Sequence, residues 1–298
     1  MRNIIVLGSG YSGSGAVFDY LIGRDDCLNP LNSNEARWIN DPGGVIDFLN
    51  RLDVFYPALA SDAYEEFLMM SREFGHHLPD SMKPHLQGLL NDMVLMDYQA
   101  MPLYKINKMN KLQVLTFRVF KKLGLRGTNS RVYLPKSRDQ VLKLVTDFFE
   151  NFKGGLDEGI FVFNQAGSYW NPERSTECFG IRKVVRVSRD PRDIYADLKN
   201  KRSLFPTNNV EEFCKWFKES QVLIQSLEWE HCIDIKFEDF VTNFDRERKS
   251  LCDFLGIPSE IDSSYSVAGS RVNMGKHRRI LSQYESSFIE DSLSDFIV

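Results

Sequence analysis

Two short stretches of the sequence combine residue types that bind anions. The first is LGSGYSGSG, residues 7–15, which follows an apolar run. Its glycines let backbone N–H groups approach a phosphate, its serines add hydroxyl donors, and a following helix adds partial positive charge. The second is KVVRVSRDPRDIYAD, residues 183–197, in which Arg189 ends an apolar run just before a helix start at Asp190. A guanidinium there can bind a phosphate through paired hydrogen bonds, and the alternative is a salt bridge to Asp190 or Asp193.

The first stretch lacks a residue that two common phosphate-binding classes require. An ATPase or kinase loop, GxxxxGK[ST], carries a lysine, but this loop continues as Ser12, Gly13, Ser14, Gly15 and Ala16. A GxGxxG pattern is present, but the acidic residue that a dinucleotide-binding fold places about 20 residues later is missing. We therefore expect backbone N–H groups and hydroxyls to hold the anion. The alternative is a tight turn without a ligand.

The elements that position these stretches can be predicted from hydrophobic spacing. Short apolar runs predict strands over 3–7, 160–163, 183–187 and 232–235. A helix is expected from residue 15 to 21, and others after the last two strands. Helical spacing in the middle of the chain predicts helices over 44–52, 62–76, 85–98, 109–123 and 138–152.

Strand–loop–helix units at both ends of the chain predict an α/β fold, with a parallel β-sheet flanked by helices. We expect one domain over residues 1–298, in which residues 50–157 form a large, mostly helical insertion. Ligands of open α/β sheets bind at the carboxyl ends of the strands. The insertion is therefore expected on the acceptor side of the site.

Composition limits the classes of partner. The 298 residues carry a net charge of −4, although acidic residues predominate over 53–103 and basic residues over 104–153. We expect no nucleic-acid partner, because the bulk charge is negative, and the basic runs are taken first as solvated helix faces. Neither a membrane-spanning run nor the form of a signal peptide is present, so a cytoplasmic location is expected. The five cysteines have no metal-ligand spacing, and the oligomeric state is left open.

With both stretches in view, the sequence resembles the PAPS-dependent sulfotransferase superfamily, of the carbohydrate or bacterial type. PAPS is 3′-phosphoadenosine-5′-phosphosulfate, and PAP is the product it leaves. The segment YSGSG, residues 11–15, stands where the family has a K/R-S-G-T-T type loop, and RDPRD, residues 189–193, matches the family's second motif. Residues 233–258 are similar to the family's E-D-L segment and the helix ending in F-L-G. Residues 270–281 are similar to its late basic loop.

The resemblance implies a role for each matching residue. The P-loop-like residues that would hold the 5′-phosphosulfate are Gly10, Tyr11, Ser12, Gly13, Ser14, Gly15 and Ala16. The residues that would hold the 3′-phosphate and close over the nucleotide are Arg189, Arg271, Gly275, Lys276 and Arg278. No metal is implied, since the fixed cations could supply the charge.

Two positions depart from the family pattern. Tyr11 stands where the family carries a Lys or Arg that stabilises the leaving group, so a hydroxyl replaces a charge there and Lys276 could compensate. Asp197 stands where a serine donates to the 3′-phosphate. A carboxylate repels a phosphate, so Asp197 is expected to point away, to pair with Arg271 or Lys199, or to alter nucleotide binding.

The general base and the acceptor are less defined. Glu35 is the first choice for the base and Asp41 the second, because the NSNEARWINDP segment follows the first helix, where related enzymes carry a glutamate. A solvated loop carboxylate is the alternative for Glu35. The His76–His77 pair titrates near neutrality but lies at a predicted helix end. Asn164–Gln165 could contact the acceptor.

The sequence therefore predicts a transferase that moves a sulfuryl group from PAPS to a hydroxyl acceptor. A carbohydrate or polysaccharide is expected, because the insertion is aromatic-rich and locally basic. The alternative is a catalytically impaired nucleotide-binding or regulatory protein that keeps the fold, which Tyr11 and Asp197 favour. A kinase-like enzyme is the weakest alternative because the loop lysine is missing.

Overall fold

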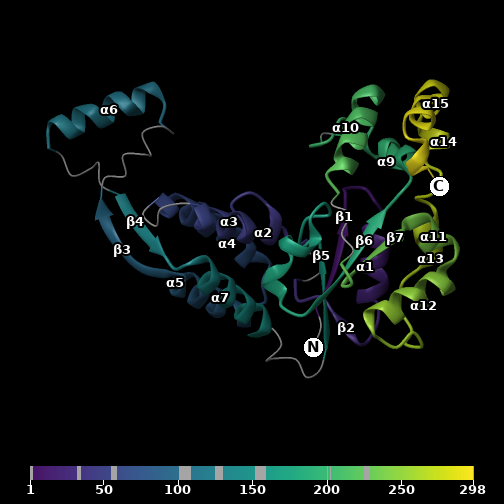
Figure 1. The fold of residues 1–298 in the computed structure, drawn as a ribbon, viewed down its shortest axis with the longest axis horizontal. Coiled ribbons are helices and arrows are strands. Elements are labelled where there is room, and N and C mark those ends of the chain that lie inside the picture. Colours follow the sequence, from purple (N-terminus) through teal and green to yellow (C-terminus); the bar gives the residue numbers. More distant parts are fainter. Residues whose placement is uncertain are drawn as a thin grey trace. The chain divides into compact units, whose positions relative to one another are not determined.

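The computed structural model describes residues 3–31, 35–54, 59–100, 109–124, 130–151, 159–199, 201, 203–224 and 229–297. The chain forms two compact units (Figure 1). Unit 1 contains residues 1–40, 77–79 and 149–298, and unit 2 contains residues 41–76 and 80–148. The predicted nucleotide-binding residues and Glu35 all belong to unit 1. The placement of residues 50–157 on the acceptor side of a single domain stays a prediction.

A parallel sheet forms the centre of unit 1. Its strands are β2 (Cys27–Leu28), β5 (Ile160–Asn164), β1 (Asn3–Gly8), β6 (Arg182–Ser188) and β7 (Cys232–Lys236), in that order. The four longer strands were predicted from their apolar runs, and each is confirmed to within one residue at either end. The predicted α/β fold with a parallel sheet is confirmed. The two-residue β2 is too short to leave a pattern in the sequence.

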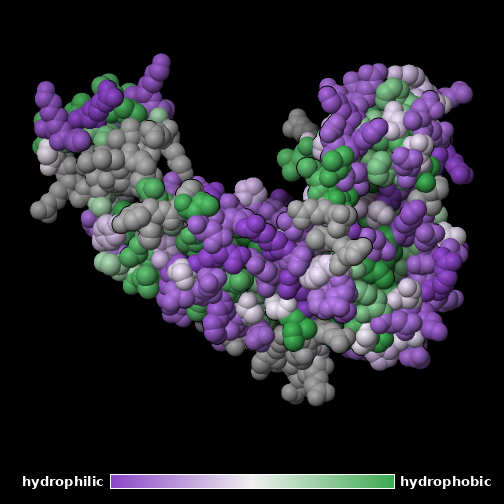
Figure 2. All heavy atoms as spheres, in the orientation of Figure 1, coloured by the Kyte–Doolittle hydropathy of each residue, from purple (hydrophilic) through white to green (hydrophobic). Residues whose placement is uncertain are grey.

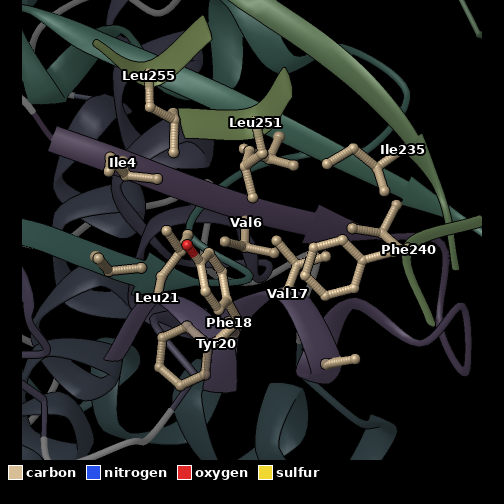
Figure 3. Close-up of a cluster of buried hydrophobic side chains, with 14 of the residues drawn as sticks. Ile4, Val6, Val17, Phe18, Tyr20, Leu21, Ile235, Phe240, Leu251 and Leu255 are labelled. Carbon is tan, nitrogen blue, oxygen red and sulfur yellow. The ribbon is translucent and has the colours of Figure 1, made fainter. Parts of the chain in front are cut away.

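Helices cover the sheet because alternate strand residues point to opposite faces. Ile4 and Val6 of β1 pack with Val17, Phe240 and Leu251 into one buried cluster (Figure 3). A second cluster joins three other helices, α9, α10 and α15. The helices of unit 1 are α1 (Ser14–Ile22), α2 (Arg37–Asn40), α8 (Pro172–Ser175), α9 (Pro191–Leu198), α10 (Val210–Val222), α11 (Phe237–Thr242), α12 (Phe244–Leu255), α13 (Val267–Arg271), α14 (His277–Ile280) and α15 (Gln283–Ser292).

Unit 2 is mostly helical and also contains a two-stranded antiparallel sheet. Its elements are α3 (Val45–Val54), α4 (Ala60–His77), α5 (Lys83–Asp92), β3 (Val94–Ala100), α6 (Lys111–Lys122), β4 (Ser130–Pro135) and α7 (Arg138–Asn151), of which α4 and α7 end in unit 1. The prediction of a helix over 85–98 is wrong beyond Asp92. Residues 94–100 pair instead with β4, with Tyr98 opposite Val132.

The helix α6 has no buried residue. Its apolar side chains lie at the surface among charged ones (Figure 2). Among the helices that the structure describes, none combines the length and the apolar character needed to cross a membrane.

Candidate functional site

The glycine- and serine-rich loop connects β1 to α1 and has an unusual backbone. Gly10, Tyr11 and Gly13 all have positive φ, at 89°, 54° and 80°. A Cβ on Gly13 would lie 2.5 Å from the ring of Phe237, so this position requires glycine. Gly13 also precedes the first turn of α1, and no side chain caps that turn. The N-terminal N–H groups of α1 are therefore not capped by a side chain and carry its positive dipole end.

Ser12 is the most informative residue of the loop. Its side chain is buried, with the residue 1% exposed, yet its Oγ has no hydrogen-bond partner among the described residues. The neighbouring Ser14 Oγ accepts a hydrogen bond of 3.1 Å from Gln165 Nε2. Gln165 Oε1 in turn accepts one of 3.2 Å from the N–H of Gly8. Gln165 therefore bridges the two ends of the loop, a role that sequence reasoning missed when it assigned this residue to the acceptor.

Arg189 is at the carboxyl end of β6, as predicted, and its guanidinium contacts the loop. Nη1 donates to the carbonyl of Tyr11 at 2.9 Å and to Asp197 Oδ2 at 2.7 Å, and Nη2 donates to the carbonyl of Asn273. The expected alternative of a salt bridge to Asp190 or Asp193 is wrong. Asp190 caps α9 by accepting from the N–H of Arg192 at 2.8 Å and pairs with that side chain instead.

Asp197 connects two of the predicted nucleotide-binding residues. Its Oδ2 accepts from Arg189, and its Oδ1 accepts from Lys276 Nζ at 2.9 Å. Burial raises the pKa of Asp197, but hydrogen bonds from Lys276 and Arg189 outweigh it, so the pKa lies below its usual range. Of the alternatives left open for Asp197, pairing with Arg271 or Lys199 is wrong, because its carboxylate pairs with Arg189 and Lys276, and Lys199 pairs with Glu285 at 2.8 Å.

The late basic segment is attached to α9 through a second aspartate. The buried Asp193 accepts from the N–H groups of Gly275 and His277, at 2.7 and 2.9 Å, and pairs with His277 Nδ1. Gly275 has a φ of 65°, which suits the turn before Lys276. These contacts place the segment beside Arg189. Arg271 and Arg278 lie exposed on either side of the turn.

Glu238, at the start of α11, fixes the beginning of α9 from the other side. Its Oε1 accepts from the N–H of Asp190 at 2.9 Å. The side chain is buried, and this burial raises its pKa above the ordinary value. The position of Arg189 is thus set by the sheet, by the cap of α9 and by Glu238 together.

Tyr11 is 40% exposed, and a cation lies over it. Lys201 Nζ is 4.6 Å from the centre of the Tyr11 ring, within the range of a cation–π contact. Lys276 was expected to compensate for the missing loop cation, but Asp197 already pairs with its ammonium group. The described contacts thus place two cations at Tyr11, with Lys201 over its ring and Arg189 at its carbonyl. In the sequence, Lys201 is marked only by the locally basic run in which it lies.

The candidate bases lie in different parts of the molecule. Glu35 is exposed, and its backbone forms a parallel bridge with Asn164, the residue before Gln165. Glu35 therefore lies beside the carboxyl end of β5, next to the residue that holds the loop. Asp41 and His76 belong to unit 2, and the His76–His77 pair is exposed at the end of α4.

A cavity of about 380 Å³ opens beside the loop. Ser9, Ser188 and Lys236, which end or follow three adjacent strands, all line it together with Arg189. Its size falls within the range of small-molecule sites. Among the residues described, no group of three or more His, Cys, Asp or Glu side chains could hold a metal ion.

No protein-family profile matches the chain, and no curated protein sequence matches it. Solved structures that are similar to it include the following three. The sulfotransferase domain from the curacin biosynthetic pathway is 15% identical over 99% of this chain and 98% of that chain, with a TM-score of 0.46. The sulfotransferase domain from the Synechococcus PCC 7002 olefin synthase is 13% identical over 99% of this chain and 94% of that chain, with a TM-score of 0.46. A sulfotransferase from Alicyclobacillus acidocaldarius is 12% identical over 94% of this chain and 96% of that chain, with a TM-score of 0.39. All three are described as sulfotransferases or sulfotransferase domains.

Proposed function

We propose that this chain is a sulfotransferase that moves a sulfuryl group from a nucleotide 5′-phosphosulfate to a hydroxyl acceptor. The observation that carries the proposal is the hydroxyl of Ser12, buried in the loop without a partner among the described residues. Burying an unpaired hydroxyl costs about 1–3 kcal/mol. An anion at the uncapped start of α1 would accept its hydrogen bond and remove that cost.

The loop fits one end of the donor that the motifs predict. The 5′ group of PAPS would meet the residues from Gly10 to Ala16, where the serine hydroxyls and the first turn of α1 supply donors. The 3′-phosphate does not fit two of the residues predicted for it, because Arg189 and Lys276 both pair with Asp197.

The transfer needs charge stabilisation, an oriented acceptor and a base. The donor supplies a sulfur–oxygen bond that breaks while the acceptor oxygen forms a new bond to sulfur, and the acceptor's proton passes to the base. Ser12 and the N–H groups of α1 would stabilise the negative charge that the nucleotide phosphate gains. Tyr11 and Lys201 add a hydroxyl and a positive charge beside the loop. Glu35 is the proposed base, because its backbone lies next to Asn164.

The acceptor is proposed to be a carbohydrate or polysaccharide hydroxyl. The support is compositional: residues 104–153 are rich in basic and aromatic side chains, which suits a polar or anionic sugar polymer. A second candidate function is nucleotide binding without turnover. Tyr11 in the place of a cation and the pairing of Arg189 with Asp197 favour it.

A transfer assay separates these functions. PAPS or adenosine 5′-phosphosulfate with a radiolabelled sulfuryl group is incubated with a panel of sugars. Each reaction contains wild type, Ser12→Ala or Ser287→Ala. We expect wild type and Ser287→Ala, which alters an exposed serine of α15, to transfer label, and Ser12→Ala to lose transfer while its melting temperature stays equal or rises. Full transfer by Ser12→Ala would contradict the proposal. Nucleotide-dependent stabilisation without transfer from either donor would select the second function.

A further inference from the structure

Two of the positive charges expected to meet a 3′-phosphate, those of Arg189 and Lys276, are already paired within the chain. Asp197 pairs with Arg189 at 2.7 Å and with Lys276 at 2.9 Å, one carboxylate oxygen for each cation. The side chains of the three residues are 14%, 3% and 23% exposed, respectively. Water screens such a cluster less than it screens surface pairs, so the attraction between these charges is strong.

Three of the five N–H donors of Arg189 are already used within the chain. Its Nη1 is shared by the Tyr11 carbonyl and Asp197, and its Nη2 donates to the Asn273 carbonyl. Its Nε is buried and has no partner among the described residues. Two parallel hydrogen bonds to a phosphate would need two donors on one edge of the guanidinium. The Nη1–Nη2 edge of Arg189 could therefore bind a phosphate in this way only after displacing one of these partners.

The surrounding contacts keep Asp197 in this position. Asp197 belongs to α9, and Arg189 lies just before that helix. Asp193, also in α9, accepts hydrogen bonds from the N–H groups of Gly275 and His277. Lys276 lies between those two residues. If Asp197 turned away, two cations would lose their partner while the backbone around Lys276 stayed in place.

The net charge of the cluster also disfavours a second phosphate. Two cations and one carboxylate leave the cluster of Arg189, Lys276 and Asp197 with a single positive charge. A phosphate with two negative charges would leave the whole group negatively charged, and the nearby carboxylate would repel it. The lowered pKa of Asp197 keeps that carboxylate ionised at neutral pH. A free hydroxyl in the same place can instead donate a hydrogen bond to the carboxylate.

We propose that the Asp197 carboxylate occupies the place where a 3′-phosphate would bind. The chain then selects a nucleotide donor with a 5′-phosphosulfate and a free 3′-hydroxyl. Adenosine 5′-phosphosulfate belongs to this class, whereas PAPS does not. This inference rests on the proposed function, because it assumes that the loop binds the 5′ group of a nucleotide. It names the class of donor that the proposed function leaves open.

Calorimetric titration of the full chain with adenosine 5′-phosphate and with PAP tests the inference. Wild type should bind adenosine 5′-phosphate at least about tenfold more tightly than PAP. Asp197→Ser frees both cations and adds a hydroxyl donor, so its affinity for PAP should rise by about tenfold or more. Its affinity for adenosine 5′-phosphate should change by less than about threefold, because the 3′-hydroxyl of that ligand donates a single hydrogen bond there, which the serine hydroxyl can also accept.

Two further variants make the outcome decisive. Asp197→Asn removes the charge but keeps the shape, and it replaces the serine variant if tryptophan fluorescence shows that the serine variant is unfolded. Asp25→Asn removes an exposed carboxylate of unit 1 and should change neither affinity. PAP binding to wild type as tightly as adenosine 5′-phosphate would overturn the inference and leave the proposed function standing. Binding of neither nucleotide by wild type or the Asp197 variants would overturn the proposed function itself.

Discussion

Gly13 and Gly15 are two residues apart in the same loop, but the structure places them in opposite environments. Gly13 has a φ of 80°, and an added Cβ would lie 2.5 Å from the ring of Phe237. Gly15 has no positive φ, and nothing lies within 4 Å of an added Cβ. We therefore expect Gly13→Ala to lower the free energy of unfolding and Gly15→Ala to leave it unchanged or raise it.

The size of the difference follows from two terms. Alanine in the left-handed region costs about 1–2 kcal/mol. Forcing a methyl group against a packed side chain costs about 1–3 kcal/mol. Phe237 is buried in the cluster that packs against α1, so its ring cannot move away freely. Gly13→Ala should thus lower the free energy of unfolding by about 2–5 kcal/mol, whereas Gly15→Ala, in the first turn of α1, should raise it by about 0.5–1 kcal/mol.

Urea unfolding followed by tryptophan fluorescence measures both changes. All four tryptophans, Trp38, Trp170, Trp216 and Trp229, belong to unit 1, so the signal reports the unit that carries the loop. The unfolding midpoint of Gly13→Ala should fall clearly below that of wild type, with the slope unchanged. Equal midpoints for the two variants would refute the described backbone of the loop.

Three further predictions use the same assay. Asp26→Asn leaves the buried guanidinium of Arg24 unpaired and should cost about 3 kcal/mol, whereas the exposed Asp25→Asn should change the free energy by less than about 0.5 kcal/mol; equal losses would contradict this. Gln165→Ala removes two hydrogen bonds to the loop and should cost about 1–3 kcal/mol, and no loss would disprove the bridge. The ion pairs of Asp197 lower its pKa, so they stabilise the fold above the ordinary pKa of 3.8, and this stability is lost as the pH falls through the lowered value. The midpoint difference between wild type and Asp197→Asn should therefore shrink in acid, and a difference that grows would contradict the pairing.

Much of the fold could be predicted because its signals are local. The apolar runs that became β1, β5, β6 and β7 are short, continuous and followed by loop residues, which is typical of strands buried in a parallel sheet. The start of α9 was predicted from its capping aspartate and proline. The helix expected over 85–98 ended at Asp92, because pairing of 94–100 with the distant β4 outweighed the local helical spacing.

Some contacts of the candidate site could likewise be predicted from the sequence, and others could not. The loop and Arg189 come together because parallel strands end at one edge of a sheet, which sequence order alone predicts. The partners of Asp197 could not be predicted, because they depend on how α9 packs against the late basic segment. Gln165 and Lys201 reach the loop from turns, where no periodic pattern indicates the direction of a side chain. The roles assigned to all of these residues in catalysis stay predictions.

The melting temperature of wild type with saturating adenosine 5′-phosphate tests most directly whether the loop binds a nucleotide through Ser12. A ligand at about 100 times its dissociation constant adds roughly 2.7 kcal/mol of stability. At about 2–4 °C per kcal/mol the melting temperature should rise by roughly 5–10 °C. We predict this rise for wild type and Ser287→Ala, little or none for Ser12→Ala, and none for wild type with NAD. No rise in wild type, or an equal rise in Ser12→Ala, would contradict the central claim.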